Sequence, residues 1–200
     1  MNGVSNIPVP RNEPINSYAP GTPERAALKA AIKELSGTVT EIPAVIGGKE
    51  FRFKNSHKVT SPHKHSLHIA TVYEADAKAV AAAIQAAKRA HRDWSRWRFE
   101  NRAAIFLKAA ELLAGPWRDI INAATMVGQS KTAFQAEIDS ACEIVDFWRF
   151  NPWLAEQIYA GQPLQTPGAW NRLEYRPLEG FIYAITPFNF TAIGANLPTA

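Results

Sequence analysis

The sequence contains a single cysteine, Cys142, among its 200 residues. One thiol cannot form an internal disulfide, and it cannot complete a cysteine-rich metal site. The sequence therefore excludes a disulfide-stabilised fold and fits a reducing compartment.

Long apolar runs and a targeting leader are also lacking. No stretch approaches the roughly 18 consecutive apolar residues that a membrane helix needs. Residues Met1 to Arg11 show neither an apolar segment with a cleavage site nor an Arg-rich amphipathic helix, so we predict no signal or transit peptide. We expect a soluble, cytoplasmic protein without a membrane partner.

Basic clusters and phosphate-binding glycine loops are absent as well. The net charge is +4, but lysine and arginine are scattered rather than gathered into the runs that follow nucleic-acid phosphates. No Gly-x-Gly-x-x-Gly motif joins a strand to a helix. The sequence thus argues against a nucleic-acid partner and against an ordinary Rossmann domain.

Four of the five histidines, His57, His63, His65 and His68, lie close together. Their density suggests a divalent-metal site. However, no carboxylate or cysteine lies among them, and solvated side chains in a Pro-bounded loop explain the spacing equally well. We predict no bound metal.

Apolar residues make up 46% of the whole chain, enough for a globular core. Most of the chain before residue 160 is predicted to be helical. Residues 1–22 are expected to form an extended lead-in, and Thr22-Pro23-Glu24 has the pattern of a helix start. Short β-like runs fill residues 42–72. Apolar spacing then predicts helices over 76–94, 105–115, 117–128 and 132–159, which together make a helical layer.

A different pattern follows residue 160. Residues 172–176 alternate as a half-exposed strand does, whereas Phe181-Ile-Tyr-Ala-Ile185 is continuously apolar. A continuous apolar run is typical of a strand buried on both faces of a parallel sheet. Helices followed by such a strand predict an α/β fold, and the chain ends before the neighbouring strands of that sheet. We therefore expect an incomplete folding unit.

Asn189 lies where ligands bind in open parallel sheets, just beyond the carboxyl end of the predicted strand. An asparagine amide there can donate a hydrogen bond to an oxyanion without acting as a base. It can equally well be part of a turn stabilised by Pro187. The pattern alone leaves both alternatives open.

Several motifs resemble those of one family. Thr186-Pro-Phe-Asn-Phe190 is similar to the aldehyde dehydrogenase signature in which an asparagine lies between aromatic residues. Further matching segments are Asn12–Pro14, Gly21–Arg25, Met126–Thr132, Gln135–Asp139, Asp146–Asn151 and Leu178–Phe181. Together they cover nearly the whole chain and resemble the pyrroline-5-carboxylate dehydrogenase subfamily.

The resemblance implies a fold and an activity. The fold is the amino-terminal portion of the aldehyde dehydrogenase fold: a helical layer with the start of a parallel Rossmann-like sheet. Residues 23–200 would be the first part of an NAD-binding domain, with part of the oligomerisation strands at about 160–178. The implied reaction is oxidation of L-glutamate γ-semialdehyde, the open form of pyrroline-5-carboxylate, to L-glutamate in proline degradation. Its cofactor is NAD, and the complete protein is expected to form a homo-oligomer.

The resemblance also implies roles for four residues. Asn189 corresponds to the oxyanion stabiliser, Thr186 to a residue of the NAD pocket, and Phe190 to an aromatic wall of the aldehyde tunnel. Glu143, which we place between Phe147 and Phe150 on one helix face, corresponds to a glutamate that binds the substrate's ammonium group. The alternative is a solvated acid in a stripe with Asp139 and Asp146.

Cys142 is not expected to be the nucleophile. It is predicted to lie in the middle of a helix, without a neighbouring His or Lys and outside the Gly-Gln-x-Cys setting of the family nucleophile. These 200 residues alone are therefore predicted to be inactive. The alternative is a non-catalytic remnant or an oligomerisation module.

Overall fold

The computed structural model describes residues 6–196 and consists of helices and a small mixed sheet. The elements, in chain order, are α1 (Pro23–Ser36), β1 (Thr40–Ile42), β2 (Ala44–Ile46), β3 (Lys49–Phe51), β4 (Ser56–Ser61), β5 (Lys64–Tyr73), α2 (Ala77–Trp94), α3 (Phe99–Ala114), α4 (Arg118–Gln129), α5 (Ala133–Ala136), the π-helix η1 (Glu137–Cys142), α6 (Glu143–Ala160) and the 3₁₀ helix η2 (Ile193–Ala195).

The sheet has the order β1-β5-β4, in which β1 pairs with β5 in parallel and β4 pairs with β5 antiparallel. A separate hairpin joins β2 and β3 through Gly47 and Gly48. Their φ angles of 59° and 78° are those of the tight turn that suits twisted hairpins, which explains the Gly-Gly pair. The predicted β-rich segment is confirmed.

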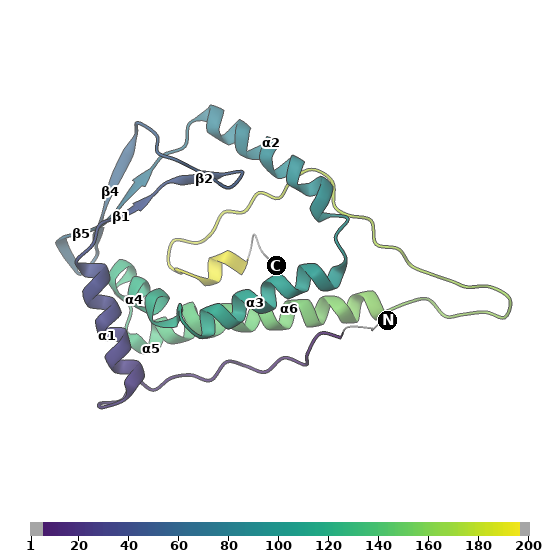
Figure 1. Ribbon diagram of the computed structural model, residues 1–200, viewed down its shortest axis with the longest axis horizontal. Helices are drawn as coiled ribbons and strands as arrows, with labels where there is room; N and C mark the ends of the chain where they lie inside the picture. Colours follow the sequence, from purple (N-terminus) through teal and green to yellow (C-terminus); the bar gives the residue numbers. More distant parts are fainter. Residues whose placement is uncertain (1–5, 197–200) are drawn as a thin grey trace.

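In Figure 1, α3, α4 and α6 lie below the sheet, whereas α2 lies above β2. Helix α1 packs against α4, and α3 packs alongside α6. Tyr18, Leu28 and Ala123 are buried together where α1 meets α4. Each predicted helix is present, although α3 begins at Phe99, well before the expected residue 105. No helix of residues 6–196 is both long and apolar enough to cross a membrane.

The predicted helix over 132–159 contains a π-helical segment that the sequence pattern does not reveal. It begins at a capping box between Thr132 and Gln135, widens through η1 and continues as α6. The wider turn places Glu137, Ser140 and Cys142 together in the interior. Such π-helical turns often occur near functional sites.

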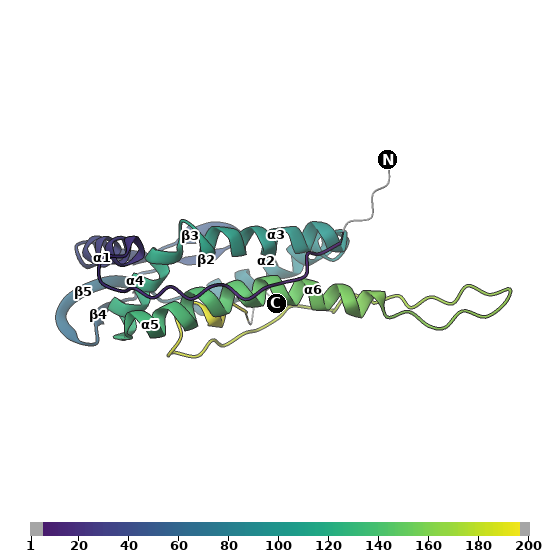
Figure 2. The same ribbon diagram turned by 90° about the horizontal axis from the view of Figure 1, so that it is seen from below.

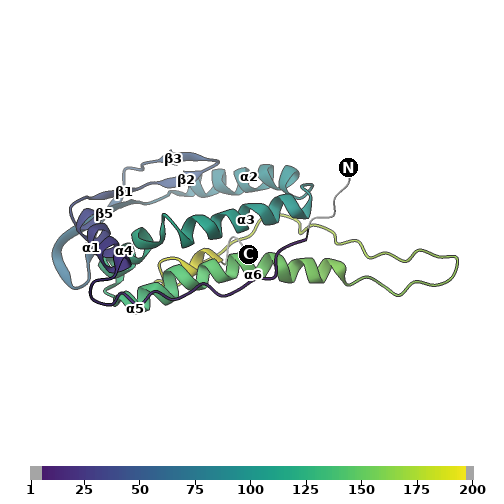
Figure 3. The same ribbon diagram turned by 60° about the horizontal axis from the view of Figure 1, so that its bottom comes forward.

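The lead-in lies extended alongside α6 and η1, as Figures 2 and 3 show. Side chains of the long helix fix its backbone: Glu156 accepts a hydrogen bond from the Ile7 amide, and Asp146 accepts one from the Glu13 amide. The lead-in is thus extended along the long helix, but it bends at Tyr18 and turns at residues 20 and 21 before α1 begins.

The strands predicted after residue 160 do not form. Residues 161–180 project as a long loop in Figures 1 and 3 and contain one isolated bridge, Thr166 to Ala169. Ile182, Tyr183 and Ile185 are 70–78% exposed rather than buried. A strand buried on both faces needs paired neighbours and covering layers, and no strand of residues 6–196 lies beside this segment. The α/β fold class is correct, but this strand prediction is wrong for the chain as it stands.

Candidate functional site

The turn Thr186–Phe190 lies against the connection between α4 and α5. Gln129 donates a hydrogen bond from Nε2 to the Phe188 carbonyl oxygen at 3.3 Å, and Lys131 donates one from Nζ to the Asn189 carbonyl oxygen at 2.5 Å. The Lys131 ammonium also lies 4.4 Å from the centroid of the Phe190 ring. The backbone of the turn is therefore held, while the Asn189 side chain remains exposed.

Thr186 is fixed at the other end of the turn. A Cβ added to the buried Gly194 would lie 3.1 Å from the Thr186 Cβ, tighter than most Cβ contacts, so the neighbouring residue would have to shift by a few tenths of an ångström. Glycine at this position therefore lets η2 pack closely against the turn. Thr186 itself is exposed.

Glu143 is the first residue of α6 and lines a cleft of ≈ 360 Å³. Phe147 and Phe150 line the same cleft, so the three residues share a helix face as predicted. Burial, and next the charge of Asp139, raises the pKa of the Glu143 carboxyl above its ordinary value, while Lys131 opposes the shift. Nearby positive charge therefore does not fully offset the negative charge of the Glu143 carboxylate, and a bound cation would do so.

Asp139 and Asp146, the two other acids of the predicted stripe, already have partners. Asp139 forms an ion pair with Lys131, and both side chains are largely buried. Asp146 accepts hydrogen bonds from Asn12 Nδ2 and from the Glu13 amide, each at 2.7 Å. Glu143 is therefore not simply one member of a solvated acidic face.

Sequence reasoning missed a buried ionic cluster centred on Glu137, which is fully buried. Its carboxylate pairs with Arg118 and accepts hydrogen bonds from Tyr18 Oη at 2.7 Å, Asn122 Nδ2 at 2.8 Å and the Asn16 amide at 2.7 Å. Burial is the largest influence and raises the pKa of Glu137, but the hydrogen bonds and the Arg118 charge together hold that pKa below its ordinary value. The cluster attaches the lead-in to η1, immediately before Glu143.

Cys142 borders this cluster and is buried. Burial, and next the charge of Glu137, raises the pKa of its thiol to about 12. Because the thiolate is the nucleophilic form, the thiol would be almost wholly protonated at neutral pH. This environment agrees with the prediction that Cys142 is not the nucleophile.

The histidines of the predicted loop contact different partners along β4 and β5. His57 Nε2 lies 2.6 Å from Glu74, and His63 Nδ1 lies 2.8 Å from the Ser130 hydroxyl. His68 contacts the Ala70 carbonyl oxygen. Across residues 6–196, no three His, Cys, Asp or Glu side chains are grouped closely enough to hold a metal ion.

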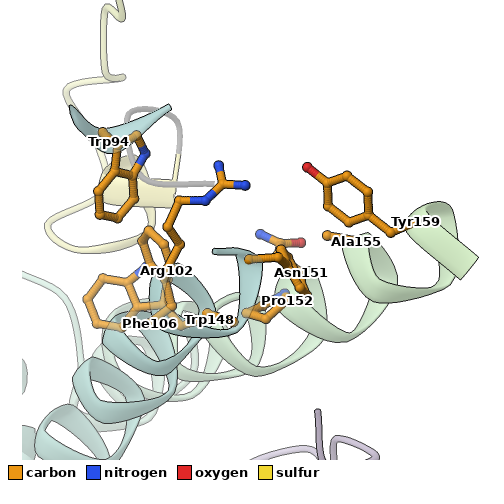
Figure 4. Close-up of a pocket in the computed structure, with 10 residues that line it drawn as sticks. Trp94, Arg102, Phe106, Trp148, Asn151, Pro152, Ala155 and Tyr159 are labelled. Atoms are coloured by element: carbon orange, nitrogen blue, oxygen red, sulfur yellow. The ribbon is translucent and has the colours of Figure 1, made fainter. Parts of the chain in front are cut away.

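A second cleft of ≈ 260 Å³ lies between α3 and α6 and has aromatic walls, among them Trp94, Phe106 and Tyr159. Figure 4 shows the Arg102 guanidinium lying between Trp94 and Tyr159. The predicted site residues do not line this cleft.

Comparison with known proteins locates the chain in a family and shows how much of its relatives' length the chain covers. The model of the aldehyde dehydrogenase family matches residues 51–198. The delta-1-pyrroline-5-carboxylate dehydrogenase of Agaricus bisporus is 50% identical over 194 residues, covering 96% of this chain and 36% of that protein. The human mitochondrial enzyme of the same name is 46% identical over 189 residues, covering 94% and 34%.

Solved structures show the same relationship. The structure of the Delta-pyrroline-5-carboxylate dehydrogenase from Mycobacterium tuberculosis bound with NAD matches with a TM-score of 0.96 and 50% identity, covering 100% of this chain and 37% of that one. The 1-pyrroline-5-carboxylate dehydrogenase from Thermus with bound NAD matches with a TM-score of 0.73 and 26% identity, covering 82% and 32%. The chain thus spans about a third of the length of these relatives.

These relatives also correct one prediction. The similar enzymes from Emericella nidulans, Dictyostelium discoideum and Bos taurus are named as mitochondrial. A cytoplasmic location, inferred only from the absence of a recognisable leader, is contradicted by these names.

Proposed function

The chain belongs to the aldehyde dehydrogenase family, and we propose that the complete protein oxidises L-glutamate γ-semialdehyde to L-glutamate with NAD as the hydride acceptor. By complete protein we mean a polypeptide that carries this chain together with the part of its relatives' length that the chain does not cover. One observation carries the proposal: the whole chain matches the NAD-bound pyrroline-5-carboxylate dehydrogenase from M. tuberculosis at 50% identity.

Asn189 is proposed to stabilise the oxyanion. Attack of a thiolate on the aldehyde turns its carbonyl oxygen into an oxyanion, and an exposed amide NH₂ can donate to that oxygen without exchanging a proton. Lys131 holds the Asn189 backbone carbonyl and leaves the side chain exposed, as such a donor requires. The thiolate must come from outside these residues, because the Cys142 thiol is buried with a pKa raised to about 12.

Glu143 and Phe190 are proposed to bind the substrate. The semialdehyde carries an ammonium group, and the Glu143 carboxylate lies beside Phe147 and Phe150, whose ring faces attract cations. Phe190 would form an apolar wall for the aliphatic part of the substrate. These contacts would bind an amino-acid aldehyde better than a plain aldehyde.

The residues of the turn fit NAD as a cofactor. Thr186 presents an exposed hydroxyl at the carboxyl end of residues 181–185, and Gly194 lets η2 approach without covering it. If residues 181–185 pair within a parallel sheet in the complete protein, a dinucleotide bound at their carboxyl end would follow the usual arrangement of open α/β sheets. Thr186 would contact NAD, and the nicotinamide of the bound NAD would accept the hydride.

The substrate assignment is tested by replacing Glu143 with Gln in the complete protein. KM for the semialdehyde should rise about 10-fold or more, because a charge-assisted hydrogen bond is lost, whereas KM for butyraldehyde, which has no ammonium group, should stay the same. Glu111→Gln, at an exposed position of α3, is the matched control. If the Glu143 variant raised neither KM, the proposed substrate contact would be wrong.

A second proposal concerns assembly: residues 161–180 contribute to a homo-oligomer interface. Leu164 and Trp170 are 90% and 82% exposed on a segment with almost no backbone pairing. Exposed apolar groups of this kind mark interaction surfaces. Trp170→Ser should shift the complete protein towards smaller species in sedimentation velocity, and an unchanged distribution would remove this segment from the interface.

A further inference from the structure

Lys131 lies between the long helix that carries Glu143 and the turn Thr186–Phe190. It follows Ser130, whose left-handed backbone (φ 59°) ends α4, and it precedes the capping box that starts α5. The chain direction is thus fixed on both sides of Lys131. Its side chain is 19% exposed, so most of it is enclosed by neighbours.

Three contacts converge on the Lys131 ammonium. One is the ion pair with Asp139, which is 14% exposed and lies in η1, four residues before Glu143. The second is the hydrogen bond to the Asn189 carbonyl oxygen at 2.5 Å, and the third is the face of the Phe190 ring at 4.4 Å. One cation therefore contacts both the long helix and the turn.

We propose that Lys131 is a positioning residue that sets the direction of the Asn189 amide and the Phe190 ring relative to the helix that carries Glu143. The inference rests on the proposed function, because it assumes that Asn189 stabilises the oxyanion. Lys131 does not touch the reacting atoms; it holds the backbone of the residue that does.

The geometry explains why holding a carbonyl oxygen matters. The carbonyl and the side chain of Asn189 branch from the same Cα, so a fixed peptide plane restricts where the amide NH₂ can point. Oxyanion donors act only when they lie about 2.7–3.1 Å from the developing charge. A displacement on the order of 1 Å can reduce a rate about 10²-fold.

The chemistry of the contacts also favours lysine at this position. An ammonium has three donors and one compact charge, which suits a carboxylate, a carbonyl and a ring face arranged around it. Methionine would fill similar space but would provide neither charge nor donor. Asp139 would then keep a largely buried carboxylate without its cation.

The decisive experiment is a double-variant comparison in the complete protein. Lys131→Met should lower kcat about 10²-fold while the dissociation constant of NAD changes less than about 2-fold. Asn189→Ala should lower kcat by about 10²–10³-fold. Because both changes remove the same donor, the double variant should be no slower than Asn189→Ala alone. A merely structural role for Lys131 would instead give losses that multiply.

Two control variants distinguish loss of the Lys131 contacts from a general effect of removing a lysine or of misfolding. Lys108→Met removes an exposed lysine of α3 that pairs with Glu111 and should leave kcat unchanged. Asp139→Asn keeps the side-chain shape and leaves Lys131 in place, so it should fold even if Lys131→Met does not. Because Lys131 would be held less firmly, kcat should fall about 10-fold, and this loss should disappear in the Asn189→Ala background.

The possible results separate the two proposals. If Lys131→Met and Asp139→Asn both retain wild-type kcat, or if their losses multiply with that of Asn189→Ala, the positioning role is overturned. If Asn189→Ala itself has no effect on kcat, the proposed function of the turn fails instead.

Discussion

Two regions differ in whether their side chains and backbone find partners within the chain: the region around Glu137 and the segment after residue 160. Glu137 is fully buried, yet it has an arginine, a tyrosine, an asparagine and a backbone amide as partners. Residues 181–185 are as apolar as a core strand but are largely exposed and unpaired among residues 6–196. The first region contains its own partners, whereas the second has the composition of a surface to be covered by other polypeptide.

The largest effect on stability is expected in the region around Glu137. Arg118→Met would leave the Glu137 carboxylate buried without its cation, which costs about 3–5 kcal/mol. Urea unfolding of the 200-residue chain, followed by circular dichroism, measures this loss. Arg172→Met, which breaks an exposed pair with Glu174, is the control and should change stability by about 0.5 kcal/mol at most. Equal effects of the two substitutions would erase the contrast between the regions.

The next effect should depend on context. Ile182→Asp should change the stability of the 200-residue chain by about 0.5 kcal/mol or less, because Ile182 is 70% exposed there. In the complete protein the same residue is expected to lie inside a parallel sheet, where an unpaired charge costs about 3 kcal/mol or more. Thermal unfolding of both proteins provides the measurement, and a small effect in both would show that the segment stays exposed.

The smallest effect concerns pH. The folded-state pKa of Glu137 lies below its unfolded value of about 4.3. The cluster therefore contributes its full stability above that pH and loses it as the pH falls through the folded pKa, by about 1.4 kcal/mol for each unit of lowering. Unfolding free energies between pH 7 and pH 3 should fall less steeply in Glu137→Gln than in the wild-type chain. Identical pH profiles would mean that Glu137 does not govern this dependence.

Much of the fold could be predicted because its signals are local. The helices over 77–94 and 118–129 follow from apolar spacing, and Thr22 and Pro23 mark a helix start that the structure confirms. The π-helix and the burial of Glu137 could not be predicted, because they depend on partners far away in sequence. Arg118 reaches back 105 residues to Glu13, and no local pattern records such a contact.

The strand prediction over 181–185 failed for a related reason. An apolar run reports the environment for which a segment is suited, whereas pairing depends on the strands that are present. At the site, the Asn189 motif and the shared face of Glu143 and Phe147 could be recognised in sequence. The role of Lys131 could not, although the residue lies within the Met126–Thr132 match, because its partners come from two other segments.

The proposed activity, and the role of Asn189 in it, are tested by the rate of NADH formation that the complete protein and its Asn189→Ala variant reach with saturating pyrroline-5-carboxylate, followed by absorbance. We predict an active wild-type protein and a variant whose kcat is lower by about 10²–10³-fold with unchanged circular dichroism. A wild-type protein without this activity, or a variant that retains full kcat, would contradict it.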